Sequence, residues 1–364
     1  MYIIKKNLIS LKRDNKQSNA NRGKNYFYLD RNENPIKYDK KTINKLVSIF
    51  KKIDLSRYPD TNIFKKKLSN FVGVNQENLF ITEGVSGAIK SLMEVYTIPK
   101  KTNIIFPSPT FALYPIFAKM FDVKVIKILY KNYKLNFNSL LKSINKKTSL
   151  VFLPNPNNPI EGHLSLNQIK KILRTCKKNK CFLVLDEVYY PFGKTTGVKL
   201  LKDYNNLFIM RSFSKAGGLA GIRLGYLIGS KKNINYVSKI RGGYESNTLS
   251  LEIASFFIDN YKIIKNQIKR IKEGFFYLKK NLKKEKIDFI GGTHGNYIFI
   301  DFKNKKKASF IVNFLKNNKI IVRSNWTKPF DRGFSFAGLD LINMKIFYKN
   351  FVKGLKEFKK YERI

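Results

Sequence analysis

The stretch MRSFSKAGGLAGIRLGYLIG, residues 210–229, places one lysine, Lys215, in a loop of small residues between two apolar runs. The glycines and alanines around it leave room for another molecule to approach the backbone. Ser212, Ser214 and Arg223 add hydrogen-bond donors of the kind that bind a phosphate dianion. The stretch therefore predicts a reactive lysine beside an anion-binding rim.

A lysine that reacts covalently needs a carbonyl partner and a site of low polarity. An aldehyde that also carries a phosphate meets both requirements, and pyridoxal 5'-phosphate is such a cofactor. A nucleotide phosphate loop is the alternative, because PFGKTTG at residues 191–197 contains Gly-Lys-Thr. That loop also needs a glycine upstream of the Gly-Lys pair, where this chain has Val188. We therefore favour pyridoxal phosphate.

Outward from this stretch, short apolar runs alternate with segments of helical spacing. Several runs are continuous rather than alternating, which is typical of strands covered on both faces. They are LFIT, NIIFPS, VKVIKI, SLVFLP, CFLVLDE, LFIMRS and LGYLIGS. This rhythm predicts an α/β fold with a large, mostly parallel sheet sandwiched by helices. After Ser250 a helical pattern runs to about Lys284, and mixed strand and helix patterns then predict a smaller α+β domain.

Two other buried runs end in polar residues. Asp186 closes CFLVLDE, where a strand of an α/β sheet delivers groups to a site. A carboxylate there can hold a pyridine nitrogen protonated, and Tyr189 could donate to the phenolic oxygen of the same ring. Asn158 follows SLVFLP and is held extended by Pro159, with its amide facing the same strand ends. Each signal alone is also typical of an ordinary turn or loop.

The composition excludes several function classes. A net charge of +46 suggests nucleic acid as a partner, but the lysines are scattered and Lys, Asn, Ile, Phe and Tyr are all abundant, as AT-rich codons would give. We therefore expect no nucleic-acid partner. Cys176 and Cys181 lack metal-ligand spacing, and no apolar run is long enough to span a membrane. Without a recognisable signal peptide, we expect a cytoplasmic protein with no metal site and no membrane contact.

Taken together, the motifs resemble the fold-type I pyridoxal-phosphate enzymes, and within them the histidinol-phosphate aminotransferase branch. The resemblance covers roughly residues 26–360. The family's motifs match, in order, RNENP (31–35), SRYPD (56–60), TEGVSGAI (82–89), PTF (109–111), NPNNP (155–159), DEVY (186–189) and SFSKAGGLAGIRLG (212–225). The resemblance implies a polar arm at 1–25, a large cofactor domain at 56–250, and a small domain formed by 26–55 and 251–364.

The same resemblance implies roles for individual residues. Lys215 would hold the cofactor as a Schiff base and move the substrate proton, while Asp186 would pair with the pyridine nitrogen. Asn158 and Tyr189 would bind the phenolic oxygen. The remaining cofactor contacts would be Val85 and Ser86 at a helix N-terminus, Ser212, Ser214 and Arg223 on the phosphate, Phe111 stacked on the ring, and Tyr58 reaching the partner's cofactor in a homodimer.

Departures from the family pattern affect the substrate side. The family's C-terminal arginine, which binds the substrate's phosphate or carboxylate, aligns with Gly333 when Ser335 is matched, and Arg332 lies one residue early. A shift of one residue turns a strand side chain to the other face unless a bulge compensates. NPIEG also has one residue more than the family's turn. Candidates for substrate binding are Arg31, Asn34, Arg323 and Arg332.

The resemblance implies an aminotransferase that moves an amino group between an amino-acid donor and a small anionic carbonyl acceptor. An alternative within the same cofactor class is decarboxylation of a phosphorylated amino acid such as threonine phosphate. Both reactions begin from the same adduct with the cofactor, and the sequence does not show which substrate bond stands perpendicular to the ring. A basic nucleic-acid-binding protein on an enzyme-like fold is the third hypothesis, and the intact Lys215, Asp186 and Asn158 argue against it.

Overall fold

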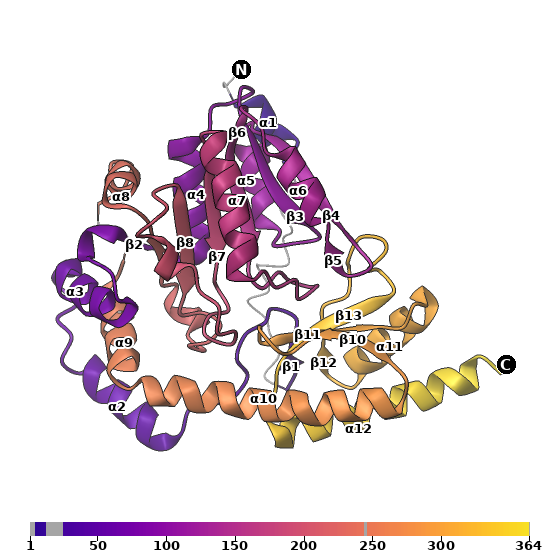
Figure 1. Cartoon of the computed structure of the whole chain (residues 1–364). Coiled ribbons are helices and arrows are strands. Elements are labelled where there is room, and N and C mark those ends of the chain that lie inside the picture. The colour runs from indigo at the N-terminus through magenta and orange to yellow at the C-terminus, as the bar shows by residue number, and fades with distance from the viewer. Residues whose placement is uncertain (1–3, 12–24, 244–245, 364) are drawn as a thin grey trace.

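The larger sheet forms the centre of the molecule. In the computed structural model, which describes residues 4–11, 25–243 and 246–363, this sheet has eight strands (Figure 1). Their spatial order is β2 (Leu79–Thr82), β9 (Gly225–Ile228), β8 (Leu207–Ser212), β7 (Phe182–Asp186), β6 (Thr148–Pro154), β3 (Asn103–Ser108), β4 (Lys124–Lys131) and β5 (Lys134–Leu135). Strands β8, β7, β6, β3 and β4 run parallel, whereas β9 is antiparallel to both of its neighbours. The predicted large, mostly parallel sheet is confirmed.

Both faces of this sheet are buried. Along β7, Leu183 and Leu185 pack into one apolar cluster with α7, while Val184 packs into a second cluster with α4 and α5. This alternation explains why the strand sequences read as continuous apolar runs. The helices around the sheet are α1 (Lys6–Ile9), α4 (Gly84–Tyr96), α5 (Leu113–Met120), α6 (Phe137–Ser143), α7 (Leu166–Lys178) and α8 (Lys231–Ser238), with short 3₁₀ turns η2 (Gln76–Asn78), η3 (Val198–Leu200) and η4 (Ala220–Ile222).

A smaller antiparallel sheet lies below the first in Figure 1. It consists of β10 (Asp288–Gly291), β11 (Tyr297–Asp301) and β13 (Gly333–Ala337), and β1 (Phe27–Tyr28) pairs with β12 (Ile320–Ile321) beside it. The remaining helices are α2 (Lys40–Phe50), α3 (Thr61–Val72), α9 (Thr248–Asp259), α10 (Tyr261–Lys284), α11 (Lys305–Asn317) and α12 (Leu341–Tyr361). The predicted α+β architecture after Ser250 is present. The assignment of domain boundaries stays a prediction.

The long helical segment predicted from Ser250 to about Lys284 is two helices. Asn260 separates α9 from α10, and its side-chain amide donates to the carbonyl oxygen of Phe256 at 2.9 Å. Helix α10 then runs along the base of the molecule, beneath both sheets (Figure 1). Within the described residues no helix has the length and apolar character needed to cross a membrane.

The strand ends place the chemically important residues. Asp186, at the carboxyl end of β7, lies in register with Pro154 of β6 and Met210 of β8. Ligands of open α/β sheets bind outside the carboxyl ends of the strands. The loops after β6, β7 and β8 therefore meet at one edge, and the N-terminal segment before α2 covers that edge.

Candidate active site

Lys215 lies in the loop after β8, and its ammonium group is enclosed. The Nζ atom donates a hydrogen bond to the backbone oxygen of Arg31 at 2.7 Å. Burial lowers the pKa of Lys215 to about 8, and the positive charges of Arg323 and Arg223 also lower it, while Glu33 opposes them. Because the nucleophilic form is the neutral amine, this environment makes Lys215 reactive near neutral pH.

Asp186 is almost fully buried, with 2 % of its surface exposed. Its Oδ2 atom accepts a hydrogen bond from the Tyr114 hydroxyl at 2.6 Å, and its Oδ1 atom accepts one from the Val188 backbone N–H at 3.0 Å. Burial still dominates and raises the pKa of Asp186 to about 6. A buried carboxylate of this kind is stabilised by a cationic partner, which a protonated pyridine nitrogen would supply.

Asn158 and Tyr189 supply two hydrogen-bond donors beside this carboxylate. The Nδ2 atom of Asn158 is buried and has no hydrogen-bond partner among the described residues. The Tyr189 oxygen accepts a hydrogen bond from the Asn32 side-chain amide at 2.8 Å, so its own proton remains available to donate. An orphaned buried donor on the loop after β6 and a second donor on the loop after β7 fit the phenolic oxygen of pyridoxal phosphate. Asn32 was not singled out from the sequence, although it lies within the matched RNENP motif.

The N-terminus of α4 forms one side of a small cradle. Among the described residues no side chain caps this helix, so the first backbone N–H groups, including those of Val85 and Ser86, are available to an anion. Gly84 adopts a φ of +64°, and a Cβ atom there would lie 3.1 Å from the Arg223 guanidinium. The cradle is therefore narrow, and it places a cation beside the helix N-terminus.

The opposite side of the cradle comes from the loop that carries Lys215. The hydroxyl of Ser212 donates to the hydroxyl of Ser214 at 2.9 Å, so both lie together. Gly225 brings β9 so close to α4 that an added Cβ atom would lie 2.7 Å from the Cα atom of Gly84. Two hydroxyls, a guanidinium and an open helix end make a donor set suited to a phosphate. The cradle fits the phosphate of pyridoxal phosphate.

Two predicted cofactor contacts lie further out. Phe111 is 39 % exposed and packs edge-on against Tyr114, with ring centroids 5.9 Å apart. Tyr58 is 75 % exposed, on the loop between α2 and α3. The structure therefore places Phe111 against Tyr114, the residue that binds Asp186, and leaves Tyr58 on the surface of its own chain.

Three of the four predicted substrate residues lie near Lys215 or its loop, and the fourth, Arg332, does not. Arg31 contributes its backbone oxygen to Lys215, and Asn34 lies against the loop, where a Cβ atom on Gly218 would be 3.0 Å from its Nδ2 atom. Arg323 lies close enough for its charge to lower the pKa values of both Lys215 and Tyr189. The Arg323 guanidinium is stacked on the ring of Trp326, 4.2 Å from the centroid. Arg323 is therefore the candidate arginine whose charge reaches the reactive lysine.

Arg332 instead binds within the small sheet. Its Nη2 atom forms an ion pair with Asp301 at 3.1 Å and donates to the Tyr133 hydroxyl at 3.3 Å. The pairing of β11 with β13 is continuous from Tyr297–Ala337 to Asp301–Gly333, without a bulge. Because the ring of Tyr297 packs on that of Tyr189 at the other end of β11, Arg332 lies at the end of the sheet away from Tyr189.

No side chain can occupy position 333 without rearrangement. A Cβ atom on Gly333 would lie 2.7 Å from the ring of Phe299 and 2.1 Å from the backbone oxygen of Ile300. Phe299 belongs to an apolar cluster that crosses between the two sheets, formed by Tyr130, Ile160, Phe299, Trp326 and Phe330. The backbone of β11 and the ring of Phe299 thus leave no room for a side chain at the position that aligns with the family's arginine when Ser335 is matched.

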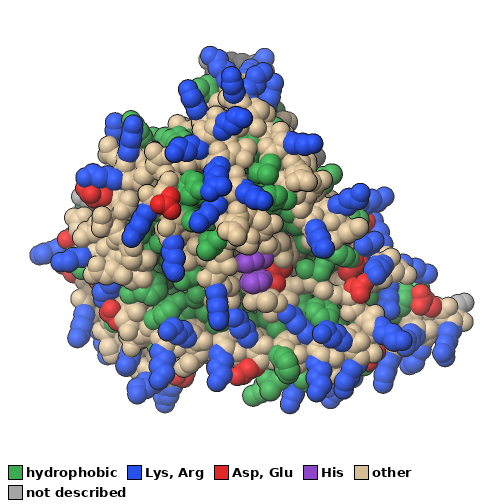
Figure 2. Space-filling view, viewed as in Figure 1, with side chains coloured by type: hydrophobic (Ala, Val, Ile, Leu, Met, Phe, Trp, Pro, Cys, Tyr) green, Lys and Arg blue, Asp and Glu red, His purple; other side chains and the backbone are tan. Residues whose placement is uncertain are grey.

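The additional residue in NPIEG has a clear partner. The Oε1 atom of Glu161 accepts hydrogen bonds from the backbone N–H groups of Thr293, His294 and Gly295, at 3.1, 2.8 and 2.8 Å. The chain's two histidines, purple in Figure 2, stack in the same region: the rings of His163 and His294 lie 4.0 Å apart. This contact between the loop after β6 and the loop before β11 was not predicted from sequence, because a carboxylate that binds backbone N–H groups leaves no side-chain motif.

The fold and the site together define a pyridoxal-phosphate-dependent aminotransferase. The chain belongs to the family described as aminotransferase class I and II, whose model matches residues 24–340, and within it to the histidinol-phosphate aminotransferase branch. The histidinol-phosphate aminotransferase of Clostridium kluyveri is 31 % identical over 300 residues, which cover 81 % of this chain and 84 % of that protein. The enzyme of the same name from Pyrococcus furiosus is 29 % identical over 276 residues, covering 75 % and 78 %.

Solved structures agree on the fold. Histidinol-phosphate aminotransferase from Sinorhizobium meliloti, in complex with pyridoxal-5'-phosphate, superposes with a TM-score of 0.87 at 18 % identity, over 98 % of each chain. The histidinol-phosphate aminotransferase from Clostridium acetobutylicum gives a TM-score of 0.81 at 22 % identity, over 91 % of this chain and 99 % of that one.

Proposed function

We propose that this aminotransferase transfers an amino group from an amino-acid donor to a small anionic carbonyl acceptor, and that Arg323 binds the anionic group. The observation that carries the proposal is the place of Arg323, whose backbone pairs with Ser335 of β13 and whose charge lowers the pKa values of Lys215 and Tyr189. Two further observations support it: Arg332 is ion-paired with Asp301, and the ring of Phe299 fills the space beside Gly333.

The residues of the chain would divide the work as follows. When bound, pyridoxal phosphate supplies an electron sink for the carbon that loses its proton. Lys215, whose lowered pKa of about 8 leaves part of the amine neutral at that pH, would hold the cofactor and then carry the proton between the two carbon atoms. Asp186 would stabilise the positive charge on the ring nitrogen, and Asn158 with Tyr189 would bind the phenolic oxygen. The α4 N-terminus with Ser212, Ser214 and Arg223 would bind the phosphate.

A homodimer with shared active sites is part of this proposal. Several large apolar side chains are exposed on α2, on α3 and on the loop between them, which also carries Tyr58. They are Ile43, Val47, Phe50, Leu55 and Ile63. A second copy of the chain would cover this surface and bring Tyr58 to the partner's phosphate cradle. We further propose that the enzyme works in the cytoplasm on small molecules, without a nucleic-acid partner.

Substrate assays test the proposal. The names of its relatives make histidinol phosphate with 2-oxoglutarate the reference pair, to be compared with a panel of amino-acid donors and anionic keto acids. We expect a higher kcat/KM with another donor and anionic acceptor than with histidinol phosphate and 2-oxoglutarate. The reason is that Gly333 stands where the family has the arginine that binds the substrate's phosphate or carboxylate. Release of carbon dioxide instead of amino transfer would identify the decarboxylase alternative.

Two arginine variants test the assignment of the anion contact. Arg323→Gln should lower kcat/KM for the best anionic acceptor by about 30-fold or more, since losing one partner of a buried charge pair costs roughly 2–5 kcal/mol. Arg332→Gln is the matched control and should leave KM within about twofold, because its ion pair with Asp301 lies outside the site. Efficient turnover of histidinol phosphate that collapses in Arg332→Gln would contradict the proposal.

A further inference from the structure

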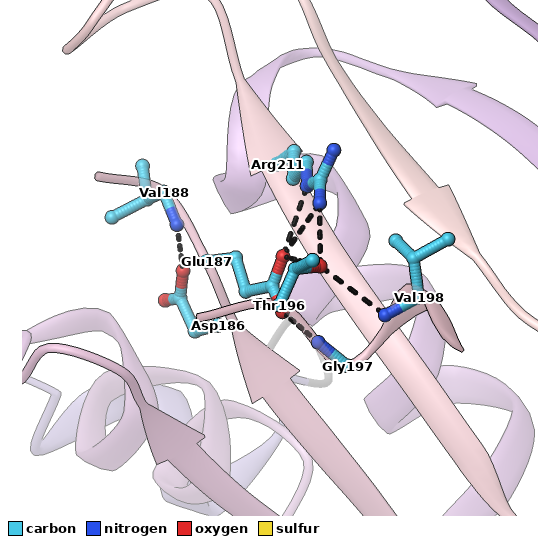
Figure 3. A network of polar contacts seen from close by, with 7 residues as sticks. All are labelled: Asp186, Glu187, Val188, Thr196, Gly197, Val198 and Arg211. Carbon is cyan, nitrogen blue, oxygen red and sulfur yellow. Dashed lines mark hydrogen bonds and ion pairs between the residues drawn. The ribbon is translucent and has the colours of Figure 1, made fainter. Parts of the chain in front are cut away.

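A buried ion pair lies directly beside two predicted cofactor residues without belonging to the predicted set. Glu187 is 1 % exposed and Arg211 is 5 % exposed. The Nη2 and Nε atoms of Arg211 donate to the Oε2 atom of Glu187 at 2.8 and 3.0 Å (Figure 3). The guanidinium also lies over the ring of Tyr190, 3.8 Å from its centroid. Both charges are therefore paired and removed from water.

The loop at residues 191–197 completes this network. The hydroxyl of Thr196 donates to Glu187 Oε2 at 2.9 Å and accepts from Arg211 Nη2 at 2.7 Å, and the Gly197 N–H donates to Glu187 Oε1 at 2.6 Å. Figure 3 shows the bonds from Arg211 and Gly197 meeting at Glu187, and the separate bond from Arg211 to the Thr196 hydroxyl. Thr196 and Gly197, which directly follow the Gly-Lys-Thr sequence that suggests a phosphate loop, thus bind a carboxylate of their own chain. Full hydrogen bonding is the condition under which a buried ion pair offsets its desolvation.

The pair is adjacent in sequence to the cofactor residues on both strands. Glu187 directly follows Asp186 at the end of β7, and Arg211 directly precedes Ser212 at the end of β8. Successive side chains of a strand point to opposite faces. The ion pair therefore joins the two strand ends on one face, while Asp186 and Ser212 face the other.

We propose that Glu187 and Arg211 are positioning residues that hold Asp186 and Ser212 at the separation needed to bind the ring nitrogen and the phosphate of one cofactor molecule. The inference rests on the proposed function. Asp186 and Ser212 would contact opposite ends of the same rigid ligand, so an error in their separation weakens both contacts at once. A displacement of about 1 Å in a positioned group can lower activity by about 100-fold.

An apolar pair of similar size would also fill this volume, but it would not fix the orientation of one strand end relative to the other. Two N–H groups of Arg211 bind one oxygen of the Glu187 carboxylate, Oε2, and the Gly197 N–H binds the other oxygen, Oε1. The carboxylate is therefore held from both sides in one orientation. The double variant Glu187→Leu/Arg211→Met therefore separates packing from positioning. It removes both charges together, so that neither is left buried without a partner.

The experiment measures cofactor affinity and stability separately. Apoprotein is prepared for wild type, Glu187→Gln, Arg211→Lys and the double variant. Dissociation constants for pyridoxal phosphate and for inorganic phosphate are measured by fluorescence titration, and Tm by circular dichroism. We expect all three variants to bind pyridoxal phosphate about 10-fold or more weakly while binding inorganic phosphate within about twofold of wild type, because the cradle itself is unchanged and only its distance from Asp186 is altered.

Asp340→Asn is the matched control. It removes the charge that pairs with Arg270 at 2.7 Å between α12 and α10, far in sequence from the strand ends. We expect it to lower Tm without changing either dissociation constant. Folded variants that bind pyridoxal phosphate as tightly as wild type would overturn the inference. Wild-type apoprotein that fails to bind pyridoxal phosphate would instead overturn the proposed function, so the two failures are distinguishable.

Discussion

The Tyr114 hydroxyl donates a hydrogen bond to Asp186 Oδ2 across 2.6 Å, and both side chains are buried. This bond favours the ionised carboxylate and lowers its pKa, while burial acts in the opposite direction and is stronger. Tyr114 thus partly offsets the cost of placing a negative charge at the end of β7. The balance between these two effects sets the readiness of Asp186 to accept a cationic partner.

The balance predicts how the cofactor-free protein responds to pH. The pKa of Asp186 is about 6 in the folded state and 3.8 in the unfolded chain. Between these two pH values the folded state therefore binds more protons than the unfolded state. Stability should therefore fall as pH rises from about 4 to 6, by about 3 kcal/mol from this group. Urea unfolding of apoprotein across this range, compared with Asp186→Asn, checks the expectation. An equal slope in the two proteins would contradict it.

Tyr114→Phe isolates the hydrogen bond. Removing the donor should raise the pKa of Asp186 further and leave a weaker partner for the ring nitrogen. We expect cofactor affinity to fall by about 10-fold or more, since a hydrogen bond to a charged group contributes roughly 1.5–3 kcal/mol. Phe111→Leu provides the comparison, because it changes the ring environment without touching the carboxylate bond. Titration of apoprotein with pyridoxal phosphate measures both.

Lys215 should capture the cofactor covalently in a pH-dependent way. Because burial lowers the pKa of Lys215 to about 8, the rate of capture by apoprotein should rise with pH through a midpoint near 8 rather than near the usual 10.5. Borohydride should then fix the cofactor to the peptide that contains Lys215. Arg323→Gln should move the midpoint upward, since Arg323 lowers this pKa. Labelling of another lysine would show that the reactive amine was misassigned.

Composite active sites can be tested by mixing inactive chains. If Tyr58 completes the partner's cradle, Tyr58→Ala and Lys215→Ala chains should each be inactive alone. Heterodimers formed from them should recover up to one intact site each. Activity after subunit exchange, compared with unexchanged mixtures at the same concentration, provides the measurement. Exchanged mixtures that stay inactive would mean that each chain builds its own site.

The free energy of unfolding should fall more when the Glu161 side chain is truncated to alanine than when its charge is removed by glutamine. Glu161→Ala leaves the N–H groups of Thr293, His294 and Gly295 without an acceptor, which should cost about 1–3 kcal/mol. Burial raises the pKa of Glu161, so its charge is itself disfavoured, and Glu161→Gln should cost less than about 1 kcal/mol because the amide oxygen still accepts. Chemical unfolding of both variants, with exposed Glu357→Ala as a control, compares them.

The sheet could be predicted from sequence because its signal is local. Runs such as CFLVLDE are apolar on both faces, and a strand covered on both sides has no other pattern available to it. The residues proposed to bind the cofactor carry local signals of unequal strength: Asp186 ends an apolar run and Lys215 lies in a glycine-rich loop, whereas no local pattern marks Asn32. The break at Asn260 could not be predicted, since apolar residues continue at helical spacing across it.

The substrate side depends on contacts between distant residues. The sequence reveals that an arginine is missing at position 333, but not that Phe299 occupies its space or that Arg332 binds Asp301. The partner of Arg332 also bonds Tyr133, which lies 168 residues away from it in the chain. Such contacts follow from the packing of the two sheets on each other, which no local pattern records.

The crowding at Gly333 has a consequence for how this enzyme can change. Introducing an arginine there alone would collide with Phe299, and shortening Phe299 alone would open a cavity in the aromatic cluster. Shortening Phe299 at the same time would not make room either, because the Ile300 backbone oxygen would still lie 2.1 Å from the new Cβ atom. Any side chain at position 333 therefore requires the main chain of β11 to move, and a laboratory evolution experiment that admits one substitution at a time should keep glycine there.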